Sequence, residues 1–103
     1  MSKPYLDLYP KITERQFMGK VEQLAEYCGW WVWHDNDSRR NRAGWPDLVL
    51  LRPGRLIFAE LKTDTGKLSA EQRRILSMLK MAGQEVYVWR PTDFETIRGI
   101  LKR

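Results

Sequence analysis

The sequence predicts a single α/β domain, a mixed β-sheet flanked by helices, with the element order α-β-β-β-α-β-α. Three observations predict this class. Segments with helical spacing of apolar residues stand near the beginning, in the second half and at the end of the chain. Short segments rich in β-branched and aromatic residues separate them. The 103 residues, 43% of them hydrophobic, suffice for one core, so residues 1–103 are expected to form one domain.

The first predicted helix runs from about Thr13 to Cys28. Apolar side chains recur along it every three or four residues, as a helix with one buried face requires. Thr13 is a favoured N-cap residue, because its hydroxyl can accept a hydrogen bond from the first helical turn. Gly29 favours the end of the helix. We expect Cys28, the only cysteine, to be a small buried side chain rather than a catalytic thiol.

Three strands are predicted in the middle of the chain. Trp30–His34 is rich in aromatic and β-branched residues, and a polar loop from Asp35 to Trp45 follows it. Asp47–Arg52 and Arg55–Lys62 are the second and third strands. Pro53 and Gly54 between them are typical turn residues, which predicts a hairpin.

The second half of the chain predicts one more strand between two helices. A loop over residues 63–67 leads to an amphipathic helix from Ser69 to Ala82, which Gly83 ends. The fourth strand is expected at Glu85–Arg90. A short terminal helix over Asp93–Lys102 follows, with Thr92 or Asp93 as its cap. The third and fourth strands, joined through a helix, are expected to be parallel.

The charge and composition restrict the class of partner. The net charge of +5 and a pI near 9.6 favour polyanions, of which nucleic acid is the most common, although many domains with this charge bind none. No apolar run approaches the roughly 20 residues that span a bilayer. One cysteine allows no internal disulfide, and the first ten residues lack the apolar region of a signal peptide. We therefore expect an intracellular, cytoplasmic protein without a membrane partner.

Two carboxylates and a lysine interrupt the apolar pattern of the hairpin. Glu60 and Lys62 lie two apart on one strand and so share a face. A hairpin centred at Pro53-Gly54 places Asp47 opposite Glu60, because the two positions are equally far from the turn. Adjacent carboxylates repel unless a cation neutralises them, and hard oxygen ligands select Mg²⁺ or Mn²⁺. The alternative is an exposed Glu–Lys pair on a solvated face, with Asp47 as a turn residue.

Two helical residues extend this acidic cluster. Glu14 falls near the centre of the apolar stripe of the first helix, which predicts that it points toward the sheet. Glu22 lies on a nearby face of the same helix and is the alternative. Gln72 precedes the inward-facing apolar residues of the second helix. Its spacing from Ser69 also fits a capping box, which is an equally good explanation for a glutamine there.

A basic loop directly precedes Asp47. It contains Arg39, Arg40 and Arg42, a density of guanidinium groups that suits contacts with phosphate. The alternative is an ordinary solvated loop, but its attachment to the acidic cluster favours DNA. Lys67 and Arg73 are expected to add to the same DNA-binding surface.

Three motifs together resemble one known family. They are Gly44-Trp45-Pro46-Asp47-Leu48, Phe58-Ala59-Glu60-Leu61-Lys62 and Leu68-Ser69-x-Glu71-Gln72. They are similar to the VRR-NUC family of the PD-(D/E)xK nuclease superfamily. The resemblance covers nearly the whole chain, from about residue 13 to residue 101. It implies the restriction-endonuclease-like fold and hydrolysis of DNA phosphodiester bonds with Mg²⁺ or Mn²⁺.

The resemblance also implies a role for each matching residue. Asp47, Glu60 and the backbone carbonyl of Leu61 look like metal ligands, and Lys62 looks like the catalytic lysine. Glu14 corresponds to an acid on the first helix, and Gln72 to a glutamine that supports the site.

The resemblance further implies a substrate and an assembly. Small stand-alone members look like phage or bacterial homodimers that cut branched DNA, such as four-way (Holliday) junctions. Aromatic residues on both faces around Trp31 fit a subunit interface. Two other functions stay open: a non-catalytic nucleic-acid-binding module of the same fold, and a nuclease that prefers flaps or RNA.

Overall fold

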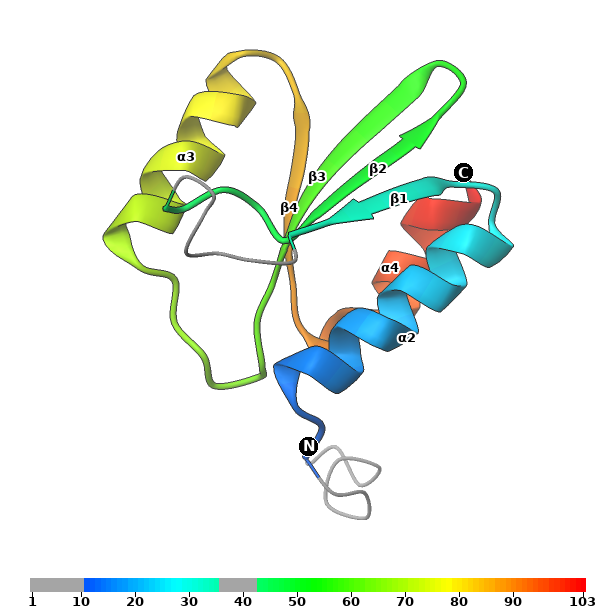
Figure 1. Cartoon of the computed structure of the whole chain (residues 1–103), viewed down its shortest axis with the longest axis horizontal. Helices are drawn as coiled ribbons and strands as arrows, with labels where there is room; N and C mark the ends of the chain where they lie inside the picture. The colour runs from blue at the N-terminus through cyan, green and yellow to red at the C-terminus, as the bar shows by residue number, and fades with distance from the viewer. Residues whose placement is uncertain (1–10, 36–42) are drawn as a thin grey trace.

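A computed structural model describes residues 11–35 and 43–103, which form a four-stranded sheet with helices on both of its faces (Figure 1). The elements in chain order are α2 (Glu14–Tyr27), β1 (Trp31–His34), β2 (Leu48–Arg52), β3 (Arg55–Leu61), α3 (Ala70–Met81), β4 (Glu85–Trp89), the 3₁₀ turn η1 (Pro91–Asp93) and α4 (Phe94–Lys102). The predicted α/β class and element order are confirmed. None of the helices within the described ranges combines the length and apolar character needed to cross a membrane.

The sheet is mixed, as expected, with strand order β1-β2-β3-β4. β2 is antiparallel to both of its neighbours, β1 and β3, and β4 is parallel to β3. The β2–β3 hairpin turns at Pro53 and Gly54, and Gly54 has φ +78°, a left-handed conformation that glycine adopts without strain. Leu48 pairs with Ala59, so the next step outward along this register brings Asp47 beside Glu60.

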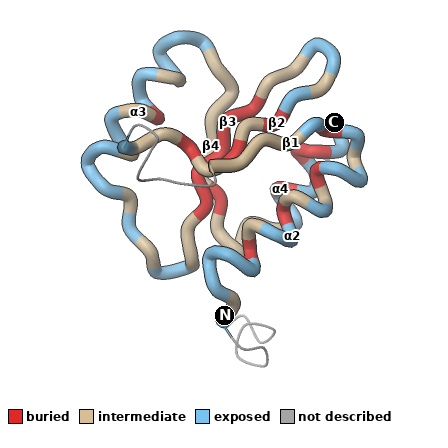
Figure 2. Tube along the Cα trace, in the orientation of Figure 1, coloured by how far each residue is buried: buried red, intermediate tan, exposed pale blue. Residues whose placement is uncertain are grey.

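The two faces of the sheet carry different helices. In Figure 1, α2 and α4 lie on one side of the sheet and α3 on the other. The main core fills the space between the sheet and α2 and α4, where buried segments gather in Figure 2. This core contains Phe17, Val21, Ala25, Trp30, Leu48, Leu50, Ile57, Ala59, Leu61, Trp89, Ile97, Ile100 and Leu101. Odd-numbered residues of β3 face this core, and its even-numbered residues, including Glu60, face α3.

Reciprocal hydrogen bonds begin both long helices. The Thr13 hydroxyl accepts from the Gln16 backbone N–H, and the Gln16 side chain accepts from the Thr13 N–H, which confirms the predicted cap of α2. Ser69 and Gln72 form the same pair at the start of α3. Each box satisfies two backbone N–H groups that the helix itself leaves unpaired.

Asp93, one of the two residues predicted to cap the terminal helix, is the N-cap residue of α4. Its side chain does not cap the helix, because a 3₁₀ turn over residues 91–93 precedes α4. The Asp93 carboxylate accepts a hydrogen bond from the Arg90 N–H, 2.9 Å away, and so closes that turn instead. Pro91 fits the first position of the turn, where no backbone donor is needed.

Candidate active site

Asp47 lies at the point where the β2–β3 ladder ends. Its Oδ2 accepts a hydrogen bond from the Leu61 N–H at 2.8 Å, two residues beyond the last backbone pair at Ala59. A side chain therefore replaces the strand backbone as the partner of β3 at this point. This bond fixes the Asp47 carboxylate against the segment 60–62 and explains why the two acidic positions meet.

Glu60 is a nearly fully buried carboxylate, 1% exposed. Its Oε2 accepts a hydrogen bond from Gln72 Nε2 at 2.9 Å and lies 3.8 Å from Lys62 Nζ. Its Oε1 has no hydrogen-bond partner among the described residues. Burial, followed by the negative charge of Asp47 and the hydrogen bond that a protonated Glu60 can donate to it, raises the pKa of Glu60 to about 8, while Lys62 opposes the shift. A buried carboxylate oxygen without a donor is costly, so this one is suited to a cation.

Gln72 serves both of the functions that its sequence position suggested. Its Oε1 accepts from the Ser69 N–H and completes the capping box, while its Nε2 donates to Glu60. The start of α3 is therefore linked directly to the acidic pair. Neither explanation of this glutamine excludes the other, because the two ends of the amide face different groups.

Gly44 packs against the same end of α3. It has φ +87°, and a Cβ atom built on it would lie 2.6 Å from the carbonyl oxygen of Glu71. Two residues further on, Pro46 is buried. The run that leads into Asp47 is therefore held against the first turn of α3, and only glycine fits at its closest approach.

The segment that follows Lys62 is held by Arg90, which the sequence did not single out. Arg90 Nη1 donates to the carbonyl oxygens of Thr63 and Gly66, each at 2.6 Å, and the Lys62 N–H donates to the Trp89 carbonyl. The Lys62 side chain is 14% exposed. These bonds fix the backbone on both sides of the lysine. In the sequence, Arg90 is one cation among 18, with no motif to mark it.

Glu14 lies at the edge of this cluster rather than inside it. It is exposed, because it begins α2 at the end that extends beyond β1 and β2 (Figure 1), but its charge interacts with the charges of Asp47 and Lys62. Partial burial and then the charge of Asp47 nevertheless raise its pKa, and Lys62 opposes this. These influences favour Glu14 over Glu22 as the helical acid of the site.

The donor set fits a hard divalent cation. Asp47 and Glu60 offer carboxylate oxygens, and the Leu61 carbonyl belongs to the same short segment whose N–H faces Asp47. Among the described residues, no three acidic, histidine or cysteine side chains converge as a complete set of metal ligands. Two carboxylates with one backbone carbonyl leave room for water and phosphate, which suits Mg²⁺ or Mn²⁺ in a reactive site.

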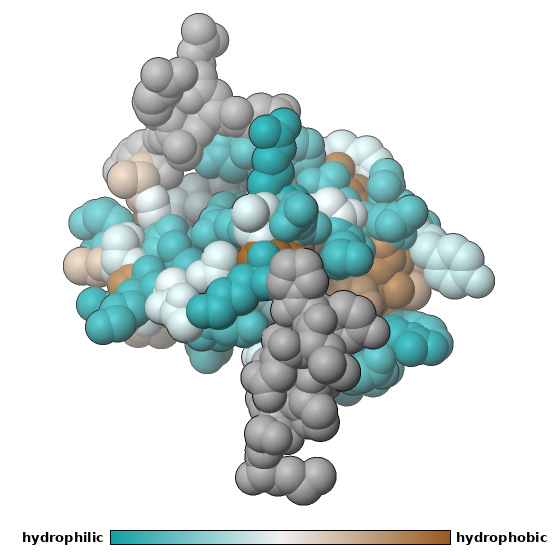
Figure 3. Space-filling view, turned by 90° about the horizontal axis from the view of Figure 1, so that it is seen from below, coloured by the Kyte–Doolittle hydropathy of each residue, from teal (hydrophilic) through white to brown (hydrophobic). Residues whose placement is uncertain are grey.

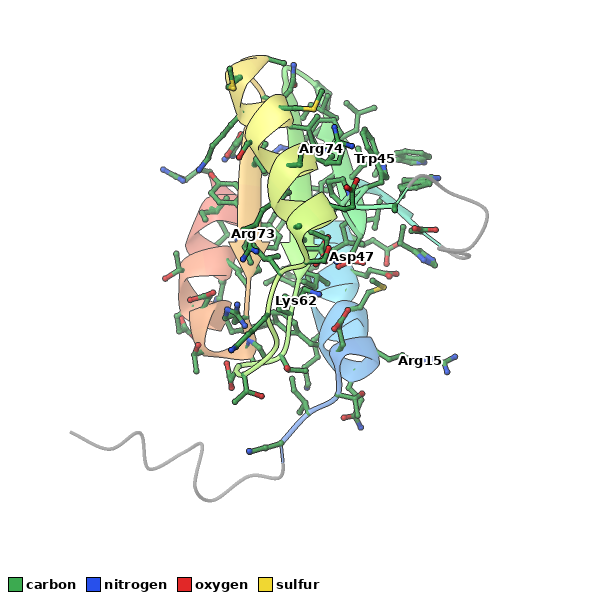
Figure 4. All side chains as sticks on the ribbon, turned by 90° about the vertical axis from the view of Figure 1, so that its left-hand side faces the viewer. Arg15, Trp45, Asp47, Lys62, Arg73 and Arg74 are labelled. Atoms are coloured by element: carbon green, nitrogen blue, oxygen red, sulfur yellow. The ribbon has the colours of Figure 1, made fainter. Side chains whose placement is uncertain are left out.

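The surroundings of the site are polar and carry cations. Figure 4 shows Asp47 and Lys62 below the start of α3, with Arg73 on the β4 side of that helix. Lys67 and Arg73 are exposed, as DNA contacts require, whereas Arg39, Arg40 and Arg42 lie outside the described residues. The face shown in Figure 3 is mostly hydrophilic, and its apolar surface gathers on the side of α2 and α4.

Comparison with known proteins gives one consistent result. The family model of the VRR-NUC domain matches residues 16–92, a range that contains Asp47, Glu60, Lys62 and Gln72 and begins two residues after Glu14. A solved "VRR_NUC domain protein" superposes with a TM-score of 0.73 at 17% identity, covering 90% of this chain and 88% of that one. A solved "VRR_NUC domain" gives 0.64 at 25% identity, covering 82% and 94%. No curated protein matches the sequence significantly.

Proposed function

Because this chain belongs to the VRR-NUC family, a family of nuclease-type domains, we propose that it is a Mg²⁺- or Mn²⁺-dependent deoxyribonuclease that hydrolyses phosphodiester bonds. The observation that carries the proposal is Glu60. It is a buried carboxylate beside a second carboxylate, with one oxygen lacking a donor and an ammonium group 3.8 Å from the other. A structural ion pair on a sheet face does not need a second carboxylate beside a buried one, whereas a bound divalent cation would neutralise both carboxylates.

Each residue of the cluster has a task in this chemistry. Asp47, Glu60 and the Leu61 carbonyl would hold the cation, and Glu14 would contribute from the helix. A bound divalent cation lowers the pKa of water and neutralises charge on the phosphate. Lys62 would orient the attacking water or stabilise the negative charge that develops on the phosphate oxygens. Gln72 and Arg90 keep Glu60 and the backbone around Lys62 in position.

The test is cleavage by variants that keep the shape of the site. We expect Asp47→Asn and Glu60→Gln to lose cleavage of plasmid and oligonucleotide DNA by at least about 100-fold, because each removes one metal-binding charge. The amide introduced by Asp47→Asn retains an oxygen that can accept the Leu61 N–H, so folding is preserved. Metal-free DNA binding should persist in both. Full activity of either variant in Mg²⁺ would rule out the proposed site.

Glu14 and Glu22 provide an internal comparison on one helix. Glu14→Gln should lower the cleavage rate in Mg²⁺, since Glu14 interacts with Asp47 and Lys62. Glu22→Gln makes the same chemical change at the alternative position and should leave the rate unchanged. If Glu22→Gln lowers the rate and Glu14→Gln does not, Glu22 is the helical acid of the site.

The substrate that we propose is branched DNA, including four-way junctions, cut by a homodimer. A symmetric pair of sites can act on two strands of one junction, and exposed Trp31 offers an apolar contact surface. Parallel assays with duplex, flap, four-way junction and RNA substrates test this choice. Preference for flaps or RNA would change the substrate class, and metal-independent binding without any cleavage would indicate a non-catalytic module.

A further inference from the structure

An open groove runs between α3 and the edge strand β4, with a volume of about 200 Å³. It lies on the α3 face of the sheet, the face that carries Glu60, because even-numbered residues of β3 and β4 share a side. Its lining combines an apolar floor with cationic and hydroxyl groups. The lining residues are Leu68, Arg73, Leu76, Ser77, Lys80, Val86, Tyr87 and Val88.

Two cations on one side of α3 border the groove. Arg73, Ser77 and Lys80 are spaced by four and three positions, so they form one row along the helix. No ion pair neutralises Arg73 or Lys80 within the described residues, and no lining residue is acidic. By contrast, Arg74 pairs with Glu71 at 3.1 Å, on the Trp45 side of the helix (Figure 4). The groove is therefore a cationic surface without a counter-charge of its own.

The groove adjoins the acidic pair directly. Val88 in its floor is the register partner of Glu60 on the neighbouring strand, and such partners lie about 4.8 Å apart. Arg73 follows Gln72, whose amide donates to Glu60. A DNA strand that lies in the groove would therefore lead toward the carboxylates of Asp47 and Glu60.

We propose that this groove binds the sugar-phosphate backbone of one DNA strand and leads it to the acidic site. The inference rests on the proposed nuclease function and adds Ser77 and Lys80 to the contacts. Arg73 and Lys80 are about 10.5 Å apart along the helix axis, close to the axial rise of three nucleotides in a duplex, which is about 3.4 Å each. The Ser77 hydroxyl can donate to a phosphate between them, and the apolar floor suits contact with deoxyribose.

A paired comparison of double variants tests the groove. Arg73→Gln/Lys80→Gln removes both groove cations, while Arg74→Gln/Arg98→Gln removes two arginines that form helical ion pairs elsewhere. Binding of fluorescein-labelled duplex DNA is measured by anisotropy in EDTA between about 50 and 200 mM salt. The groove variant should bind about 10- to 100-fold more weakly, and its log–log salt slope should fall by about 1.8. The control should keep the wild-type slope.

Two further measurements separate charge from shape and identify the partner. Arg73→Lys/Lys80→Arg retains both charges and should retain the salt slope, which a defect in packing would not. An unchanged slope in the groove variant overturns the proposal, as does a wild-type protein that binds no DNA. If the groove variant loses binding to a poly-glutamate peptide but keeps its DNA slope, the groove serves an acidic protein partner instead, and the proposal is wrong.

The binding assay also distinguishes this inference from the nuclease assignment. The groove variant could show the smaller salt slope of DNA binding while the wild-type protein cleaves no DNA in Mg²⁺ or Mn²⁺. That result would support DNA binding in the groove and refute the proposed nuclease activity. The wild-type protein could instead cleave DNA with metal while the groove variant keeps the wild-type salt slope of DNA binding. That result would support the nuclease activity and refute DNA binding in the groove.

Discussion

Glu60 experiences two opposing influences at the scale of a single side chain. Burial and the neighbouring Asp47 favour its neutral form, and Lys62 favours its charged form. The first two dominate, because the pKa is raised from 4.5 to about 8. In the absence of a cation, ionisation of this carboxyl group therefore opposes folding at neutral pH. The same ionised form is the one that can bind a metal.

This conflict predicts a specific dependence of stability on pH. A carboxyl pKa raised in the folded state contributes stability that is fully present below about pH 4.5 and is lost as the pH rises toward 8. Metal-free protein should therefore lose up to about 1.4 kcal/mol of unfolding free energy per pH unit in this window. Glu60→Gln should remove most of that slope and be the more stable protein at pH 8, as measured by thermal unfolding in EDTA.

Added metal supplies the control for that measurement. Mg²⁺ or Mn²⁺ at pH 8 should raise the melting temperature of the wild-type protein and not of Glu60→Gln, because ligand binding stabilises only the state that binds. Equal slopes in the two metal-free proteins would contradict the assigned environment of Glu60.

The sequence predicted the acidic pair but not all of its surroundings. The meeting of Asp47 and Glu60 followed from counting residues outward from the hairpin turn, because strand register is a local property. The exposure of Glu14 and the hydrogen bonds of Arg90 depend on how a helix and a distant strand end are placed in space. Periodicity gives the direction of a side chain about its helix, but not how far the sheet extends over it.

At the scale of whole elements, α3 connects folding to the site through Gln72. Gln72→Ala should destabilise the protein by about 0.5–2 kcal/mol, because the capping box is lost. It should also weaken Mg²⁺ binding by about 10- to 100-fold, because Glu60 loses its amide donor. Gln16→Ala removes the equivalent box of α2 and should lower stability alone. Calorimetric titration with metal and thermal unfolding separate the two effects, and equal metal affinities would exclude a supporting role for Gln72.

The contact between Gly44 and α3 gives a second prediction for this element. Gly44→Ala and Gly54→Ala both place a side chain at positive φ, which costs about 1–2 kcal/mol. Only at Gly44 would the new methyl group also meet the helix backbone, 2.6 Å from the Glu71 oxygen. Gly44→Ala should therefore be the less stable variant in urea denaturation and should lose cleavage activity. If the two variants have similar stability and similar cleavage activity, the segment that leads into Asp47 can shift without affecting the site.

Most helices and strands could be predicted from the sequence, because capping and turn residues mark their ends. Thr13 and Ser69 marked two helix starts through capping chemistry that involves only neighbouring residues. The terminal helix was different. Asp93 is a good capping residue by type, but its carboxylate bonds to the Arg90 N–H within a 3₁₀ turn, a competition that propensity alone does not resolve.

At the scale of the whole molecule, the helices leave part of the sheet surface uncovered. Trp31 and Leu51 are register partners on β1 and β2, and they are 62% and 47% exposed. They face the same side as Glu60, where α3 packs along β4. Neighbouring exposed apolar side chains of this size are typical of contact surfaces between proteins.

We therefore predict that Trp31→Ser/Leu51→Ser weakens self-association. Size-exclusion chromatography with light scattering should show a dimer for the wild-type protein and a monomer for this variant, because its interface would lose two apolar contacts. Tyr27→Ser removes an equally accessible aromatic residue, 87% exposed, from α2 and serves as the control. A wild-type mass equal to one chain would exclude the homodimer.

The hydrogen bond from the Leu61 amide to Asp47 has one further consequence. The acceptor of this backbone proton is the same carboxylate that would share its electrons with a cation, so the shielding of the proton must respond when the carboxylate is engaged. In a nitrogen-15 correlation spectrum, the Leu61 resonance is then a native indicator of site occupancy that needs neither a label on DNA nor turnover. Titration with magnesium should move this peak progressively, while the amide of Gly54 at the remote hairpin tip stays in place.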